Sequence, residues 1–159
     1  MPLEILNIFS PLIQKKPVEE ILSCNSMTVR YGLVLTERDA VDLLETGDRA
    51  LKSNGRIEFG GGVIPKIIAE FCDSPYLTKD GWIETLRELT ELFYYFKNET
   101  MDLISDDDLI AFMKEQFDGK CHGSPALLAD ALDSFARRTR DGTDPDRPED
   151  EMGVDDDGY

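Results

Sequence analysis

The chain has 159 residues, of which 33 are acidic and 17 basic, and its formal net charge at pH 7 is −16. This length fits a single domain that folds without a disulfide or a metal. Its negative charge argues against binding to nucleic acid or to an anionic membrane surface, since both kinds of binding rely on Lys and Arg. We therefore expect any partner to be a neutral or basic protein.

The cysteine pattern and the hydropathy pattern both favour a cytoplasmic location. Cys24, Cys72 and Cys121 lie about fifty residues apart, form no CxxC pair and are odd in number, which is typical of a reducing compartment. The first residues lack a basic segment before a long apolar run, so no signal peptide is predicted. No apolar run approaches the roughly 20 residues that a membrane-spanning helix needs.

The first elements with a clear pattern lie between residues 28 and 55. Residues 28–35 are rich in β-branched and aromatic side chains, and residues 56–59 alternate polar and apolar. The two segments predict one minor β element, and the alternative for the first is an extended lead-in to the next helix. Between them, Thr36 and Asp39 have the spacing of a helix-capping box. The helix that follows contains Gly47, which indicates either close packing or a bend, and it ends at Gly55.

Four further helices follow in the sequence. One runs from about residue 63 to 71, and the longest is predicted from Lys79 to Asn98, with Thr78 as its cap. Ser105 caps a third, and Ser124 with Pro125 opens the last. The longest helix is expected to be central because its apolar stripe is wide; that stripe consists of Trp82, Leu86, Leu89, Phe93 and Phe96.

These elements predict a mostly α fold, a compact helical bundle of about five main helices. Residues 1–140 form the single predicted domain, and the first 26 residues are the hardest to interpret. Residues 141–159 contain nine acidic residues and one arginine, which is half of the net charge of the chain. A segment with so few apolar residues cannot offset its ordering entropy, so it is predicted to be a disordered acidic tail.

The glycine-rich segment before the second helix has two interpretations. Consecutive backbone N–H groups of Gly60, Gly61 and Gly62 next to a helix N-terminus can bind an anion, and Arg56 and Lys66 would assist. The spacing matches neither nucleotide-binding glycine motif. The alternative is a tight turn that lets the chain pack closely.

Neither a metal centre nor a cofactor is predicted. Cys121 and His122 are two adjacent candidate ligands, but structural zinc needs four, and His122 is the only histidine. Glu84, Glu88 and Glu91 line one face of the long helix; without Glu-x-x-His motifs they are interpreted as a solvated acidic face rather than a di-iron site.

Phe93, Tyr94, Tyr95 and Phe96 form an aromatic run that spans more than half of the helix circumference. The run is interpreted chiefly as core, because a central helix buries most of its surface. The alternative is that these four residues form a protein-interaction surface, where Tyr and Phe are favoured.

Several stretches of the chain resemble a small family of bacterial proteins of anaerobic Gram-positive type that has no assigned activity. They are YGLVLTERDA (31–40), ALKSNGRIEFGGG (50–62), AEFCDSPYL (69–77), ELFYYFKNET (91–100) and DDDLIAFMKEQFDGKCHGS (106–124). The resemblance covers most of the domain but not the acidic tail. It implies a bacterial cytoplasmic protein and carries over no catalytic residue or cofactor.

Two classes of function therefore remain open. The first is a non-enzymatic protein-interaction or adaptor module that acts through an aromatic or acidic surface. The second is a small-ligand or anion-binding domain, with or without enzymatic activity, that uses the glycine loop. The first is favoured because no titratable pair has the spacing typical of acid–base or nucleophilic catalysis, so no catalytic residue is predicted.

Overall fold

The computed structural model describes residues 15–55 and 62–142, and this part of the chain contains helices and no strand. Residues 15–22, the first that the structure describes, are helical. The elements that follow are α2 (Asn25–Thr28), the 3-10 turn η1 (Val29–Tyr31), α3 (Glu37–Ser53), α4 (Ile64–Phe71), α5 (Trp82–Glu99), α6 (Asp106–Asp118) and α7 (Pro125–Arg140). The predicted mostly α bundle is confirmed, and α3 to α7 are its five main helices.

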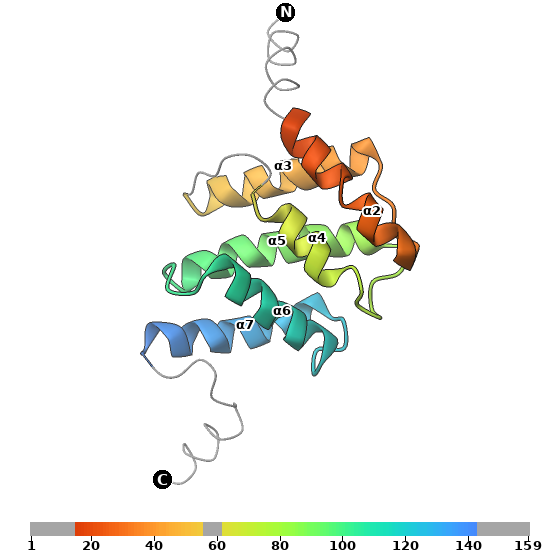
Figure 1. Ribbon diagram of the computed structural model, residues 1–159. Helices are drawn as coiled ribbons and strands as arrows, with labels where there is room; N and C mark the ends of the chain where they lie inside the picture. Colours follow the sequence, from red (N-terminus) through yellow and green to blue (C-terminus); the bar gives the residue numbers. More distant parts are fainter. Residues whose placement is uncertain (1–14, 56–61, 143–159) are drawn as a thin grey trace, which may run out of the picture.

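Helix α5 lies at the centre of the bundle (Figure 1). It contacts α3 on one side and α7 on the other, while α4 and α6 contact each other and pack against it. In Figure 1, α4 and α6 cross in front of α5. The five helices thus form two layers, with α3, α5 and α7 in one and α4 and α6 in the other.

The predicted β element at residues 28–35 is wrong. Thr28 ends α2 and residues 29–31 form η1, while side chains bond the backbone of Leu33 and Leu35. The Asn25 amide donates to the carbonyl of Leu35 at 2.9 Å, and its oxygen accepts from the Leu35 N–H at 2.7 Å. The Thr28 hydroxyl donates to the Leu33 carbonyl, and Gly32 turns the chain with a φ of 77°. Residues 56–59 lie outside the described residues.

Helix α3 begins and ends as its sequence predicts. The Thr36 hydroxyl accepts from the Asp39 N–H at 3.1 Å and the Asp39 carboxylate accepts from the Thr36 N–H at 2.9 Å, which completes the capping box. Gly47 reflects close packing, because a β-carbon there would lie 3.3 Å from Cδ1 of Ile64 in α4. The helix stops before Gly55, which has a φ of 67°.

Helix α5 begins later than predicted. Thr78 does not cap it, because its hydroxyl donates to the carbonyl of Asp80. The N-cap is Gly81, and its φ of 87° is left-handed. A residue in that conformation cannot continue a right-handed helix, so the helical segment starts at Trp82.

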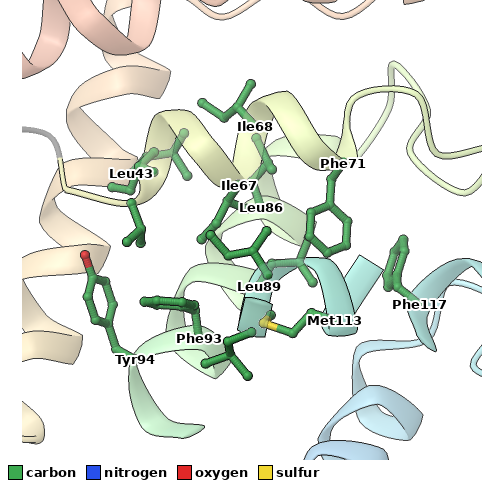
Figure 2. Close-up of a cluster of buried hydrophobic side chains, with 14 of the residues drawn as sticks. Leu43, Ile67, Ile68, Phe71, Leu86, Leu89, Phe93, Tyr94, Met113 and Phe117 are labelled. Atoms are coloured by element: carbon green, nitrogen blue, oxygen red, sulfur yellow. The ribbon is translucent and has the colours of Figure 1, made fainter. Parts of the chain in front are cut away.

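The core is built around the inner face of α5 (Figure 2). The five residues of its predicted stripe are all buried, and the view in Figure 2 shows Leu86, Leu89 and Phe93 pointing toward side chains of α4 and α6. Phe71 and Phe117 meet edge to face, with ring centroids 5.4 Å apart. Burying an aliphatic or aromatic side chain of this kind stabilises a fold by about 1.5–3 kcal/mol, so this face of α5 holds the layers together.

Local caps define the last two helices. The Ser105 hydroxyl accepts from the Asp108 N–H, and the Ser124 hydroxyl accepts from the Leu127 N–H. These bonds satisfy donors that the first turn of a helix leaves free. Helix α7 ends at Arg140, where the predicted domain also ends. Most of the predicted tail, residues 143–159, lies outside the described residues.

Candidate functional site

The outer face of α5 carries the acidic stripe seen in the sequence. Glu84, Glu88 and Glu91 are exposed, and Tyr95 follows four residues later with 49% of its surface accessible. A helix turns by 100° per residue, so these four residues fall within about 60° of one another. They lie opposite Leu86 and the rest of the buried stripe. One helix therefore carries the core on one face and a polar, aromatic surface on the other.

Two hollows run along this outer face. The first, of about 550 Å³, lies between α3 and α5 and is lined by Thr46, Arg49, Gly81, Glu84, Thr85, Arg87, Glu88 and Glu91. The second, of about 330 Å³, lies between α5 and the start of α7 and is lined by Glu88, Glu91, Leu92, Tyr95, Pro125 and Ala126. Glu88 and Glu91 belong to the lining of both, so the two hollows adjoin on either flank of α5. We call the two hollows together the α5 groove.

The two hollows of the α5 groove differ in charge. Arg49 and Arg87 line the first hollow together with three carboxylates, and Arg87 lies 3.9 Å from one of them, Glu84. At the Tyr95 end, the second hollow has two carboxylates and no cation in its lining. Neither Glu88 nor Glu91 has an ion-pair partner among residues 15–55 and 62–142. These two carboxylates are therefore available to a cation from outside the chain.

Tyr95 is the aromatic residue that this groove presents to solvent. Its ring meets the buried ring of Phe96 edge to face, with a centroid separation of 4.8 Å. Within the described part of the chain its hydroxyl makes no hydrogen bond. An aromatic ring that packs against a buried neighbour while its hydroxyl is open to a new hydrogen bond is typical of an interface residue.

The structure corrects the aromatic surface predicted from the sequence. Phe93, Tyr94 and Phe96 are buried, as the core interpretation predicts, and they are not accessible to a partner. Only Tyr95 of the four is exposed. The helical phase explains the difference, because Tyr95 shares its face with Glu84, Glu88 and Glu91 rather than with its aromatic neighbours.

Only part of the predicted glycine-loop site lies in the described residues. Gly62 is in a turn with a φ of 63°, while Arg56, Gly60 and Gly61 lie outside the described residues. The Lys66 ammonium lies 3.0 Å from the Asp107 carboxylate at the start of α6. The hydrogen bond with Asp107 raises the pKa of Lys66 above its ordinary value. An anion at this loop would compete with Asp107 for Lys66.

The cysteines and the histidine do not form a common site in the part of the chain that the structure describes. All three thiols are buried, and burial raises the pKa of Cys24 and of Cys72, which lowers their reactivity. Cys121 is buried whereas the adjacent His122 is exposed, with its Nδ1 3.3 Å from the Tyr76 hydroxyl. Residues 15–55 and 62–142 contain no group of three or more His, Cys, Asp or Glu residues that could hold a metal.

The sequence analysis missed one polar cluster, which joins the loop after α4 to the end of α6. The Lys114 ammonium lies 2.7 Å from the Asp73 carboxylate and 3.0 Å from that of Asp118. The Ser74 hydroxyl donates to Asp118 at 2.6 Å and accepts from the Tyr76 N–H. The hydroxyl is thus fully engaged and the lysine holds two carboxylates, so the cluster is a cross-link between elements. More than 40 residues separate its two halves, so no local pattern indicated it.

The described residues define the class of the protein as an all-α domain whose central helix carries an acidic outer face with an exposed tyrosine. Residues 20–145 match DUF6323, a family of unknown function, and the chain belongs to this family. Comparisons with curated proteins and with solved structures found no match. The helices of the described segments include none that is both long enough and apolar enough to cross a membrane. The resemblance to a family without an assigned activity is confirmed, while its bacterial source stays a prediction.

Proposed function

We propose that this protein is a non-enzymatic interaction or adaptor module that binds a neutral or basic protein through the α5 groove. One observation carries the proposal: Tyr95, Glu88 and Glu91 line the same hollow and have no charged partner of their own in the described residues. Large amphipathic rings contribute strongly to protein interfaces, and unpaired carboxylates attract a basic partner over a range of about 8–10 Å at physiological salt.

The position of the groove on a central helix favours binding. The backbone of α5 is fixed by its contacts with α3, α4, α6 and α7. A partner that docks on a fixed surface does not have to order that surface, so more of the contact energy appears as affinity. The buried thiols and the fully bonded Ser74 hydroxyl also support a module without covalent chemistry.

The alternative, an anion-binding or small-ligand domain at the glycine loop, has weaker support because Lys66 is already paired with Asp107. We also propose a cytoplasmic location, since none of the three cysteines takes part in a disulfide. Fractionation of the native cells tests that location, and recovery in an extracellular or periplasmic fraction would contradict it.

Site-specific photocrosslinking tests the proposed surface. A photoreactive phenylalanine analogue at position 95 should capture a defined protein in native cells. The same analogue at position 103, where Leu103 is at least as exposed in the loop between α5 and α6, should not capture it. The captured protein is then purified and its affinity measured directly.

With the purified partner, Tyr95→Ala should weaken binding by about tenfold or more. The matched control is Tyr31→Ala, which removes a tyrosine of similar exposure from η1. It should leave the affinity unchanged. Equal capture from positions 95 and 103, or an affinity that Tyr95→Ala does not change, would contradict binding through the α5 groove.

A further inference from the structure

One buried hydroxyl that lines the first hollow of the α5 groove has no acceptor for its proton among the described residues. Five threonines are buried in this part of the chain, and four of them donate to a backbone carbonyl at 2.6–3.0 Å, namely Thr28, Thr90, Thr100 and Thr139. The fifth, Thr46, is 1% exposed and lines the first hollow. Its Oγ1 accepts from Nη2 of Arg49 at 3.4 Å and, within residues 15–55 and 62–142, donates to no group. A buried donor without an acceptor is costly, so this hydroxyl is suited to an acceptor atom that enters the hollow.

Charges of both signs line the same hollow without neutralising one another. In the described part of the chain, Arg49 of α3 forms no ion pair, and neither does Glu88 or Glu91 of α5. Arg87 reaches only Glu84, at 3.9 Å. The hollow therefore offers an unpaired guanidinium beside the Thr46 hydroxyl on its α3 wall and two unpaired carboxylates on its α5 wall.

We infer that the first hollow binds a small zwitterion, a molecule that carries one carboxylate and one ammonium group. The carboxylate accepts from the Thr46 hydroxyl and from the Arg49 guanidinium, which can donate two parallel hydrogen bonds to it. The ammonium group donates to Glu88 and Glu91 on the other wall. This inference goes beyond the proposed function, because it concerns a small molecule in the first hollow, whereas Tyr95 lines the second.

The size and the net charge of the hollow limit the ligand. Its volume of about 550 Å³ falls within the range of about 300–1,000 Å³ that is usual for small-molecule sites. Its lining contains two arginines and three glutamates, so its net charge is negative. The glutamates would repel a phosphate or another polyanion, and a simple cation would leave the Thr46 hydroxyl without an acceptor. A zwitterion satisfies both walls and adds no net charge.

An NMR titration of the purified, isotopically labelled protein tests the inference. The probes are the ω-amino acids free glycine, β-alanine, γ-aminobutyrate and ε-aminocaproate, which hold the two charges at increasing separation. At least one of them should shift amide signals of α3 and α5 in a saturable way. Butyrate and butylamine each carry only one of the two charges and should bind about tenfold or more weakly than the best zwitterion, because each loses one set of charge-assisted hydrogen bonds.

Thr46→Val separates a ligand-binding hydroxyl from a structural one. It should not lower the urea midpoint, since the hydroxyl donates no hydrogen bond within the described chain, but it should weaken binding of the best zwitterion by about threefold or more. The matched control is Thr90→Val, at an equally buried threonine that does not line the hollow and that donates to the Leu86 carbonyl. The control should lower the urea midpoint and leave the affinity within about twofold of that of the wild type.

Charge variants test the two ends of the ligand separately. Arg49→Gln, and Glu88→Gln combined with Glu91→Gln, should each weaken binding of the best zwitterion by about tenfold. Arg38→Gln, at an exposed position of α3 outside the hollow, should leave the affinity within about twofold.

Three outcomes would overturn the inference. They are a series in which no zwitterion binds, equal binding of the zwitterions and the singly charged compounds, and an unchanged affinity in Thr46→Val, which would show that water is a sufficient acceptor for this hydroxyl. None of them bears on capture of a protein through Tyr95, so photocrosslinking judges the proposed function separately.

Discussion

The ring of Tyr76 packs directly against the backbone of Gly123. A β-carbon at Gly123 would lie 2.5 Å from both Cβ and Cγ of Tyr76, and the glycine has a φ of +78°. Tyr76 also meets Phe117 edge to face. The loop after α4 is therefore held against the turn between α6 and α7 by a contact that only glycine permits.

Gly123→Ala should destabilise the protein by about 2–4 kcal/mol, because a left-handed alanine costs about 1 kcal/mol and overpacking costs about 1–3 kcal/mol. Urea unfolding measures the loss. The control is Gly32→Ala, which has a similar φ of +77° but no atom within 4 Å of the added carbon, and should lose only about 1 kcal/mol. Equal losses in the two variants would show that Tyr76 moves aside without cost.

Asn25→Ala should destabilise the protein by about 1–3 kcal/mol, because it removes both hydrogen bonds that hold the backbone of Leu35. The stability of Asn25→Asp should lie between those of the wild type and Asn25→Ala, since the aspartate side chain keeps the acceptor and loses the donor. Asn98→Ala, at an exposed position of α5, should change the stability by no more than about 0.5 kcal/mol. If Asn25→Ala and Asn98→Ala had the same midpoint in thermal unfolding, the Asn25 amide would not hold residues 28–35 in place.

The stability that Lys114 contributes should be lost at high pH. Burial lowers the pKa of Lys114, but the hydrogen bonds and charges of Asp73 and Asp118 outweigh burial and raise it above its ordinary value. A lysine pKa raised by folding stabilises the fold fully below the ordinary value of about 10.4 and progressively less as the pH rises through the folded value. The difference in unfolding free energy between wild type and Lys114→Met should thus be constant from about pH 7 to 9 and shrink above about pH 10.5.

The control for this pH series is Lys79→Met, at an exposed lysine in the loop before α5. Its difference from wild type should be small and nearly independent of pH. A Lys114→Met difference that stayed constant up to about pH 11.5 would contradict a role for the charged ammonium in this cross-link.

We expect phosphate at up to several millimolar to leave the melting temperature unchanged, since the Lys66 ammonium is occupied by Asp107. A ligand that binds only the folded state raises the melting temperature with its concentration, so a thermal-shift titration detects such binding. Asp107→Ala provides the sharper test, because it frees Lys66. A phosphate-dependent rise that is larger in Asp107→Ala and absent in Lys66→Ala would show that the glycine loop is an anion site after all.

Local chemistry explains which elements were predictable. The starts of α3, α6 and α7 depend on Thr36, Ser105 and Ser124, each of which accepts from an N–H three residues away. Such contacts are visible in a short stretch of sequence. The start of α5 was missed because Gly81, three residues after the expected cap, adopts a left-handed conformation. A helix-propensity scale gives every glycine the same value, so it does not distinguish a glycine at the start of a helix from one inside a turn.

Contacts between distant residues explain the other differences. Residues 28–35 have the composition of a strand, but Asn25, ten residues before Leu35, takes the place of a neighbouring strand. Lys114 meets Asp73 only because α6 packs beside the end of α4. In the candidate site, the spacing of Glu84, Glu88 and Glu91 was enough to predict a solvated face. That the face is a groove depends on α3 and α7, whose positions no local pattern specifies.

The division of α5 into two faces also separates two evolutionary pressures. Substitutions on its inner face disturb the contacts of four other helices, so they are limited by folding. Substitutions at Glu88, Glu91 or Tyr95 touch solvent and should cost little stability, since changes at exposed positions are usually within about 0.5 kcal/mol. The proposed partner specificity can therefore change at the outer face without loss of the scaffold, and we expect differences among members of this family to concentrate along this one stripe of α5.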